Sequence, residues 1–338
     1  MTQGNADQLW DEVHDARQAF YEEVFGKLPP DILKPEHMTG VWPGGGLYKL
    51  KAEQLGSDTW LYTTFGLTNP DMPTRVSPIP GGAADPDQAE LTLERKQNVP
   101  DYPGRPGYGY EIAVMTQSDE EWPLWFLQWA LNAEILNDVD LLGRVENHNG
   151  LTVEDIRVGD SDWVNVLIAP ASTSVPDTFG LPNGTGRLLI ATTITDDEMV
   201  WSKAHGRETL LNKLASAGVG QVSHLTRASI LNPEPLDYAE IDSREQAEQL
   251  ANAGQLRKIH LFPLEFGGED HASNTVYVSK AASLNKKGVD QKILRLAEQG
   301  RINSYTATPS YHSNSFIPTA IQIEASGEQA VSTRIDVW

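Results

Sequence analysis

Hydrophobic residues recur at different spacings along the chain, and the spacing indicates which segments fold as helices. Over residues 7–25, apolar side chains return every three or four positions, as on one face of an α-helix, and Gly26 is placed to end that helix. A second helix is expected over residues 122–136, where most residues are apolar. Pro123 falls in the first turn of this helix, where proline is tolerated. The aromatic side chains of this segment point to all sides of the helix, which predicts core packing.

Strands are predicted where apolar residues alternate or run together over five to nine positions. In the first two thirds of the chain these runs cover residues 59–65, 110–115, 145–151, 163–168 and 187–195. Asn183 and Gly184 favour a tight hairpin turn before the last run. Thr195 and Glu198 have the spacing of a capping box, so a helix is expected to follow that strand directly.

Two segments before residue 110 lack such regularity. Residues 69–106 are rich in proline, glycine and aspartate, which predicts a long irregular loop. The glycine triplet 44–46 is not followed by the Lys-Ser or Lys-Thr pair of a phosphate-binding loop, so it indicates a structural turn.

Residues 233–242 are acidic, contain two prolines and show no periodicity, which is typical of an exposed linker. The chain of 338 residues is long enough for two domains. We therefore predict a first domain over residues 1–232 and a second over residues 243–338. In the second domain, helices are expected near 243–253 and 289–299, and strands near 258–262, 275–279, 302–308, 317–325 and 331–337. This pattern is typical of a small α+β domain.

Composition narrows the possible functions. A formal charge of −21 disfavours binding to nucleic acid or to anionic lipid and favours a basic partner, although acidity also serves solubility alone. The chain contains no cysteine, which excludes disulfides, thiolate metal sites and a cysteine nucleophile. No segment has the pattern of a secretory signal or the length of a membrane span, so a cytoplasmic location is expected.

The motifs of common active sites and metal sites are missing. No two histidines have zinc-ligand spacing. Residues 138–143 begin like a calcium loop but place Leu142 where an oxygen ligand is needed and Asn149 where a bidentate glutamate belongs. Gly159, Asp160 and Ser161 lack the surrounding pattern of a nucleophile elbow. With 47 acidic residues a pair of glycosidase carboxylates can always be nominated, so such a pair carries little information. We therefore expect no catalytic residue, no cofactor and no metal.

Several segments in order resemble the suppressor of fused family. They are residues 60–68 (WLYTTFGLT), residues 109–112 (GYEI), the helix that begins at Trp122-Pro123, the hairpin 181–184 (LPNG) and the strand and capped helix 188–198. The resemblance implies an α/β (α+β) protein in which a mixed β-sheet domain is followed by the smaller α+β domain. Residues 263–268, 274–278 and 315–318 resemble a small module of bacterial immunity-type proteins, which indicates a bacterial-type member.

The resemblance also implies a function. Animal members clamp an extended segment of a transcription factor and add it as a strand to exposed sheet edges, and bacterial members are associated with toxin neutralisation. The family has no kinase, protease or hydrolase activity. The chain is accordingly expected to be a non-enzymatic immunity protein that captures a basic protein or an extended peptide in an acidic cleft between its domains.

The candidate partner-binding residues form two groups, which are Glu146, Asn147, His148, Asp160 and Asp162 in the first domain and Glu265, Glu269 and Asp270 in the second. The first group is expected at the ends of neighbouring strands, in the region that animal members use to capture their partners. The second lies beside Gly267 and Gly268, which permit close approach of another backbone. Ordinary solvated acids are the alternative explanation for both groups. Two other functions remain open, namely a regulatory adaptor that sequesters a signalling or transcription protein and a hydrolase that uses Glu146 and Asp160.

Overall fold

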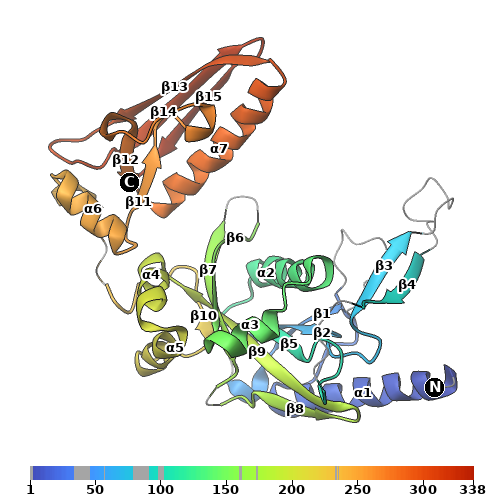
Figure 1. Ribbon diagram of the computed structural model, residues 1–338. Helices are drawn as coiled ribbons and strands as arrows, with labels where there is room; N and C mark the ends of the chain where they lie inside the picture. The colour runs from blue at the N-terminus through green and yellow to red at the C-terminus, as the bar shows by residue number, and fades with distance from the viewer. Residues whose placement is uncertain are drawn as a thin grey trace. The chain divides into compact units, whose positions relative to one another are not determined.

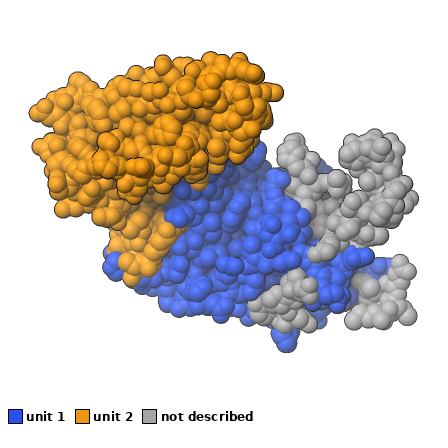
Figure 2. Space-filling view, turned by 45° about the horizontal axis from the view of Figure 1, so that its top comes forward, with its two compact units in different colours: residues 1–194, 205–227 blue, residues 195–204, 228–338 orange. Residues whose placement is uncertain are grey.

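The computed structural model describes residues 3–33, 46–56, 58–78, 91–97, 103–159, 162–172, 174–232, 234 and 236–338. The chain forms two compact units (Figure 2), the first of residues 1–194 and 205–227 and the second of residues 195–204 and 228–338. The division into residues 1–232 and 243–338 around a linker stays a prediction, and limited proteolysis would test it by cutting within 233–242.

The first unit alternates between strands and helices. Its helices are α1 (Gln3–Val24), α2 (Trp122–Leu131), α3 (Leu141–His148) and α5 (Arg207–Ser216). Its strands are β1 (Gly46–Lys51), β2 (Trp60–Phe65), β3 (Thr74–Pro78), β4 (Leu91–Arg95), β5 (Tyr110–Thr116), β6 (Leu151–Arg157), β7 (Trp163–Pro170), β8 (Thr178–Leu181), β9 (Gly184–Ile194) and β10 (Val222–Ser223).

Eight of these strands form one mixed sheet in the order β1-β2-β5-β9-β7-β6, with β8 paired to β9 and β10 paired to β5. β5 pairs in parallel with both β9 and β10, whereas the other pairs are antiparallel. β3 and β4 pair with each other in a separate hairpin (Figure 1). The mixed α/β fold that the sequence predicts is therefore confirmed.

The central strands bury side chains on both faces because successive residues of a strand point to opposite sides. On β5, Ile112 belongs to the core beneath α2 and α3, while Ala113 belongs to the core beneath α1. On β9, Leu189 and Leu188 divide in the same way. Figure 1 shows α1 on one side of the sheet and α2 on the other. The sheet is thus the middle layer of a three-layer unit.

The second unit is a smaller α+β structure with its own core. It contains α4 (Asp196–His205, except its last residue), α6 (Arg244–Asn252), β11 (Arg257–His260), β12 (Thr275–Val278), α7 (Lys280–Glu298), β13 (Ile302–Ser310), β14 (Ala320–Gly327) and β15 (Val331–Asp336). β13, β14 and β15 form an antiparallel sheet, and β11 pairs with β12. α7 contacts β11, β13 and β15. Ile241 is 5% exposed and contributes to this core.

Several predicted elements of the first unit are confirmed. β2, β5, β7 and β9 lie where alternation placed them, and Leu181 pairs with Gly184 across the expected hairpin turn. At the start of α4 the Thr195 amide donates to Glu198 Oε2 at 3.0 Å, which is one half of the predicted capping box, whereas the Glu198 amide donates to Asp197 Oδ1 at 3.0 Å. The predicted helix over 122–136 is also present, with a π-helical last turn. Its predicted burial is wrong for Trp125, which is 47% exposed.

Other predicted elements are wrong. Residues 145–148 are the end of α3 and not a strand, because Leu141, Leu142 and Val145 share one buried helix face and Asn149 ends the helix in a left-handed conformation. The segment 69–106 contains the β3–β4 hairpin, although residues 79–90 and 98–102 lie outside the described part. α7 begins nine residues earlier than the predicted start at residue 289, with Ser279 as its N-cap. β1 was not predicted. Of the glycine triplet 44–46, only Gly46, which is the first residue of β1, lies within the described part.

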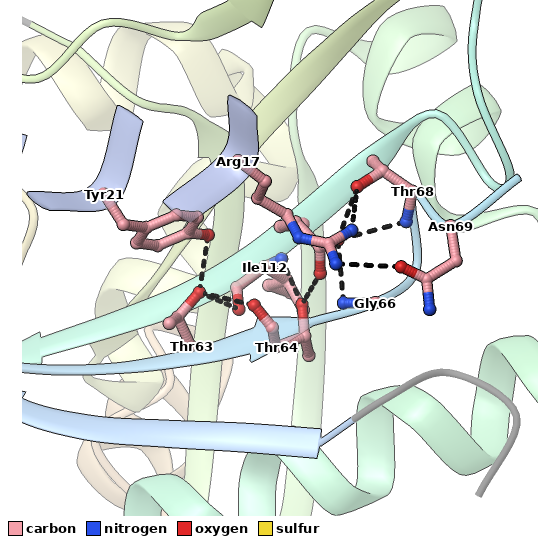
Figure 3. A network of polar contacts seen from close by, with 9 residues as sticks. Arg17, Tyr21, Thr63, Thr64, Gly66, Thr68, Asn69 and Ile112 are labelled. Atoms are coloured by element: carbon pink, nitrogen blue, oxygen red, sulfur yellow. Dashed lines mark hydrogen bonds and ion pairs between the residues drawn. The ribbon is translucent and has the colours of Figure 1, made fainter. Parts of the chain in front are cut away.

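A buried ionic network joins α1 to the sheet (Figure 3). Arg17 and Glu111 are 1% and 0% exposed, and Arg17 Nη1 lies 3.4 Å from Glu111 Oε1. Arg17 also donates to Thr68 Oγ1 and to Asn69 Oδ1, each at 2.8 Å. The guanidinium lies 4.1 Å from the ring centre of Phe65, within the range of a cation–π contact. Burial lowers the pKa of Arg17 because water no longer solvates its charge.

The Glu111 carboxylate is held by many donors. Oε1 accepts from the Gly66 and Thr68 amides at 3.0 Å and from Thr68 Oγ1 at 2.7 Å, and Oε2 accepts from Thr64 Oγ1 at 2.6 Å. Thr64 Oγ1 in turn accepts from the Ile112 amide at 3.0 Å. A buried carboxylate with this many partners positions structure, and its neighbours leave no room for a ligand.

Candidate protein-binding edge of the central sheet

β6 is the last strand in the order of the large sheet, and among the described residues its only strand neighbour is β7. Its far side therefore presents backbone amide and carbonyl groups that another strand can pair with. The opposite edge, β1, is partly covered, since Leu33 and Leu47 exchange two backbone hydrogen bonds of 2.9 Å. β6 is thus the more open of the two edges.

The first three residues of β6 pair regularly with β7, and a bulge follows between Val153 and Ile156. The bulge is fixed from β7 by Asn165, which is 1% exposed and accepts from the Asp155 amide at 3.0 Å through Oδ1. Asp155 has a φ of +55°, a left-handed conformation that aspartate tolerates better than most residues. A bulge of this kind limits uncontrolled pairing of an edge strand. The regular segment 151–153 remains as the part of β6 best suited to receive a partner strand.

Side chains of β6 make this segment amphipathic. Leu151 and Val153 pack against the core beneath α2 and α3, while Glu154 and Arg157 are exposed. An added strand would meet backbone groups along its length and charged side chains at the distal half of β6.

The predicted residues 146–148 lie on the last turn of α3, directly before β6, and all three are exposed. The strand predicted over residues 145–151 is wrong at these positions, but the three residues do lie near a strand end, because β6 begins at Leu151. Glu146 forms a two-pronged ion pair with Arg105, with both N–O distances 2.9 Å. Arg105 was missed because nothing in the sequence connects it to Glu146, 41 residues later.

Asp162 is exposed and follows the turn after β6, where its backbone carbonyl accepts from the Val158 amide at 2.9 Å. Asp160 lies outside the described residues. β6 separates residues 146–148 from Asp162, and seven strand residues span roughly 20 Å. The structure therefore does not bring these side chains into one cluster but places them at the two ends of the open strand.

The predicted residues of the second unit lie around a turn. Glu265, Glu269 and Asp270 are all exposed. Asp270 Oδ1 lies 2.8 Å from Lys258 Nζ and 3.0 Å from His260 Nε2. Hydrogen bonds from Lys258 and His260 lower the pKa of Asp270 to about 2.

A groove of about 750 Å³ in the second unit is also acidic. Its lining includes the carboxylates of Glu234, Asp237 and Glu240 and the amides of Gln246 and Gln249, and no lysine or arginine is among the described residues that line it. These acids lie in the segment predicted as a linker and are not among the predicted partner-binding residues.

Within the described ranges, no three histidine, aspartate or glutamate side chains come together as ligands for a metal ion. In the same ranges, no helix has both the length and the apolar character needed to cross a bilayer.

The family model for the Suppressor of fused protein (SUFU) matches residues 46–228, which is more than half of the chain. The chain belongs to the suppressor of fused family. The matched region contains β6 and the other seven strands of the large sheet. Family membership was predicted from the segments at 60–68, 109–112, 122–123, 181–184 and 188–198, and it is confirmed. Suppressor of fused proteins are generally not catalytic.

Two solved structures of the family are similar to this chain. The Sufu-Fu complex crystal structure is 16% identical, covers 68% of this chain and 98% of its own, and superposes with a TM-score of 0.37. The crystal structure of Drosophila Suppressor of Fused is 16% identical, covers 75% of this chain and 59% of its own, and has a TM-score of 0.36. Among curated proteins, none matches the chain. The family assignment depends on the family model.

Proposed function

We propose that this protein captures a basic polypeptide by adding one of its segments as a strand to the open edge of β6. The observation that carries the proposal is that β6 ends the large sheet with no second strand neighbour in the described part of the chain. Backbone pairing supplies affinity without requiring a particular sequence, and carboxylates around the edge supply steering. The formal charge of −21 favours a partner of opposite sign.

We further propose that the chain is a bacterial-type member and that the captured polypeptide is a toxin, which makes the protein an immunity protein. The resemblance of residues 263–268, 274–278 and 315–318 to immunity-type modules supports this role. The acidic groove at Glu234, Asp237 and Glu240 offers a second place for basic side chains. Residues 146–148, Asp162 and the acids at 265, 269 and 270 are proposed to steer the partner. The acidic cleft between domains stays a prediction.

Capture experiments with the full chain test strand addition. The variant Thr152→Lys places a long charged side chain on the regular part of β6, a change that blunts strand edges. We expect it to reduce capture of the protein's partner from its native host by at least tenfold. The matched control is Thr308→Lys on β13, an exposed threonine on an edge strand of the second unit. Equal capture by both variants would contradict the proposal.

A growth assay tests the immunity role. Expression of the chain should rescue cells that produce the captured partner, and Thr152→Lys should abolish the rescue. A partner that is captured through β6 but is not toxic would favour the alternative, a regulatory adaptor that sequesters a signalling or transcription protein.

A further inference from the structure

A cavity of about 410 Å³ in the second unit lies between β11, the 3₁₀ turn Leu264–Phe266 and α7. Its apolar lining consists of Ile259, Pro263, Leu264, Phe266 and Leu294. Leu264 is 46% exposed and the neighbouring Phe262 is 37% exposed, so two large hydrophobic side chains are accessible to solvent beside the cavity. A pocket of several hundred Å³ with apolar walls and a few polar groups is typical of a ligand site.

The polar part of the cavity is a buried ion pair on α7. Lys286 Nζ donates to Asp290 Oδ2 at 2.6 Å and to Tyr305 Oη at 3.2 Å, and Tyr305 Oη donates to Asp290 Oδ1 at 2.7 Å. The Lys286 side chain is 3% exposed, whereas that of Asp290 is 18% exposed. The carboxylate is therefore the member of the pair that a ligand can reach.

Asp290 is paired with Lys286, yet within the described part of the chain it accepts fewer hydrogen bonds than a carboxylate can. Its carboxylate accepts these two hydrogen bonds out of about four that a carboxylate can accept. Burial raises the pKa of Asp290, while Lys286 and Tyr305 lower it and the negative charge of Glu265 adds a smaller upward contribution. Glu265 is exposed and also lines the cavity, so carboxylates from the turn and from the helix border one space.

Positive charges border the cavity as well. Lys287 is exposed and its long side chain can turn away from the cavity. His260 Nε2 lies 3.0 Å from Asp270 Oδ1, with which it forms a hydrogen bond. Lys286 is held in place by Asp290 and Tyr305 and does not extend toward Glu265 in any hydrogen bond among the described residues.

We propose that this cavity receives an arginine side chain of an extended polypeptide, with its stem against Leu264 and Leu294 and its guanidinium between Glu265 and Asp290. A guanidinium is planar, stacks on an aromatic face such as that of Phe266, and supplies several donors to carboxylates. The guanidinium would donate to Asp290, which also accepts from Lys286, and to Glu265. The inference deepens the proposed function, on which it rests, by naming one side chain that the basic partner must carry.

Calorimetric titration of the full chain with short peptides tests the cavity without any natural partner. The probes are acetyl-Leu-Arg-Leu amide, its citrulline analogue, which keeps the shape but loses the charge, and its glutamate analogue. We expect the arginine peptide to bind about tenfold more tightly than the citrulline peptide, as for a charge-assisted hydrogen bond. Glu265→Gln should reduce this preference severalfold, and Glu298→Gln, an exposed glutamate at the end of α7, should leave it unchanged.

Lys286→Met gives a second test, in which the affinity for the arginine peptide should rise and not fall. Removal of the internal cation frees Asp290, so the variant should bind the arginine peptide more tightly than the native chain does. Asp290→Asn should weaken binding, which keeps the test decisive if Lys286→Met does not fold. Equal binding of the arginine and citrulline peptides, preference for the glutamate peptide, or no binding at all would overturn the inference.

The peptide titration also separates this inference from the proposed function. A chain that binds the arginine peptide here but captures no protein through β6 would refute strand addition and leave the cavity assignment standing. Capture through β6 without a preference for the arginine peptide would refute the cavity assignment and leave strand addition standing.

Discussion

Each unit of the protein contains a buried ion pair, and these two pairs are built differently. Arg17 and Glu111 in the first unit are 1% and 0% exposed, and the carboxylate accepts from two amides and two hydroxyls as well as lying beside the guanidinium. Among the described residues, Lys286 and Asp290 in the second unit have Tyr305 as their one further hydrogen-bond partner, and Asp290 is 18% exposed beside a cavity.

The difference shows how to distinguish a structural ion pair from one available to a ligand. A buried charge is costly unless its hydrogen-bonding capacity is filled, and in the first unit the protein fills it. In the second unit Asp290 accepts two hydrogen bonds from described residues and lines a cavity, which is why we propose that another molecule contributes further donors. Removal of the cation should therefore lower the free energy of unfolding more in the first unit than in the second.

The largest effect is expected from Arg17→Met. The change leaves the Glu111 carboxylate buried without its countercharge, so the free energy of unfolding should fall by about 3–5 kcal/mol. Urea denaturation followed by tryptophan fluorescence measures the loss. The control Arg95→Met removes an exposed arginine from the same unit and should stay within about 0.5 kcal/mol of the native chain. Similar losses for both variants would show that the network is not structural.

A smaller loss of about 1–3 kcal/mol is expected for Lys286→Met, since Asp290 can be hydrated from the cavity after its partner is removed. The control is Lys292→Met, which changes an exposed lysine on the same helix. The difference in unfolding free energy between the two variants measures the loss that is due to the buried pair. A loss as large as that of Arg17→Met would mean that the two pairs are equivalent and that the cavity supplies no effective hydration.

Tyr305→Phe should cost about 1 kcal/mol, the typical contribution of one hydrogen bond, because only the bond to Asp290 and the contact with Lys286 are lost. The aromatic packing of residue 305 against Phe262 and Phe266 is kept in this variant. The same denaturation assay measures the change, and a loss above that of Lys286→Met would reverse the order that we propose.

The smallest effect is expected at the exposed Asp270. Its folded pKa of about 2 lies below the usual value of 3.8, so the folded state binds fewer protons than the unfolded state between these values. The ion pairs with Lys258 and His260 therefore stabilise the chain above about pH 4, and this contribution is lost as the pH falls toward 2. Carboxyl NMR titration of Asp270 measures its pKa, and salt should raise it because the group is exposed. A pKa near 3.8 at low salt would show that the pairs do not persist in solution.

Strands with strong alternation could be predicted from the sequence, and so could the family. β2, β5 and β9 were found because their apolar residues are continuous or alternate with period two. The segments that carry the family resemblance, 60–68 and 109–112, also contain Thr64, Gly66, Thr68 and Glu111, which form the buried network. The network itself could not be predicted, because Arg17 lies 94 residues before Glu111 and pairing over that distance is set by tertiary packing.

The site was less predictable than the fold. Residues 145–148 contain apolar and polar positions that suit either a strand or a helix, and only packing of Leu141, Leu142 and Val145 into the core decides for the helix. The open edge of β6 depends on strand order, which the local sequence does not encode. The cavity at Lys286 could not be predicted either, because α7 was predicted to begin only at residue 289, after Lys286.

Hydrogen exchange of the β6 amides, measured on the free chain and on its complex with the captured partner, tests the central claim most directly. Strand addition predicts that amides of residues 151–153 that do not pair with β7 become strongly protected in the complex, while those of the β13 edge in the second unit do not change. Unchanged exchange along β6 in a stable, stoichiometric complex would contradict the account.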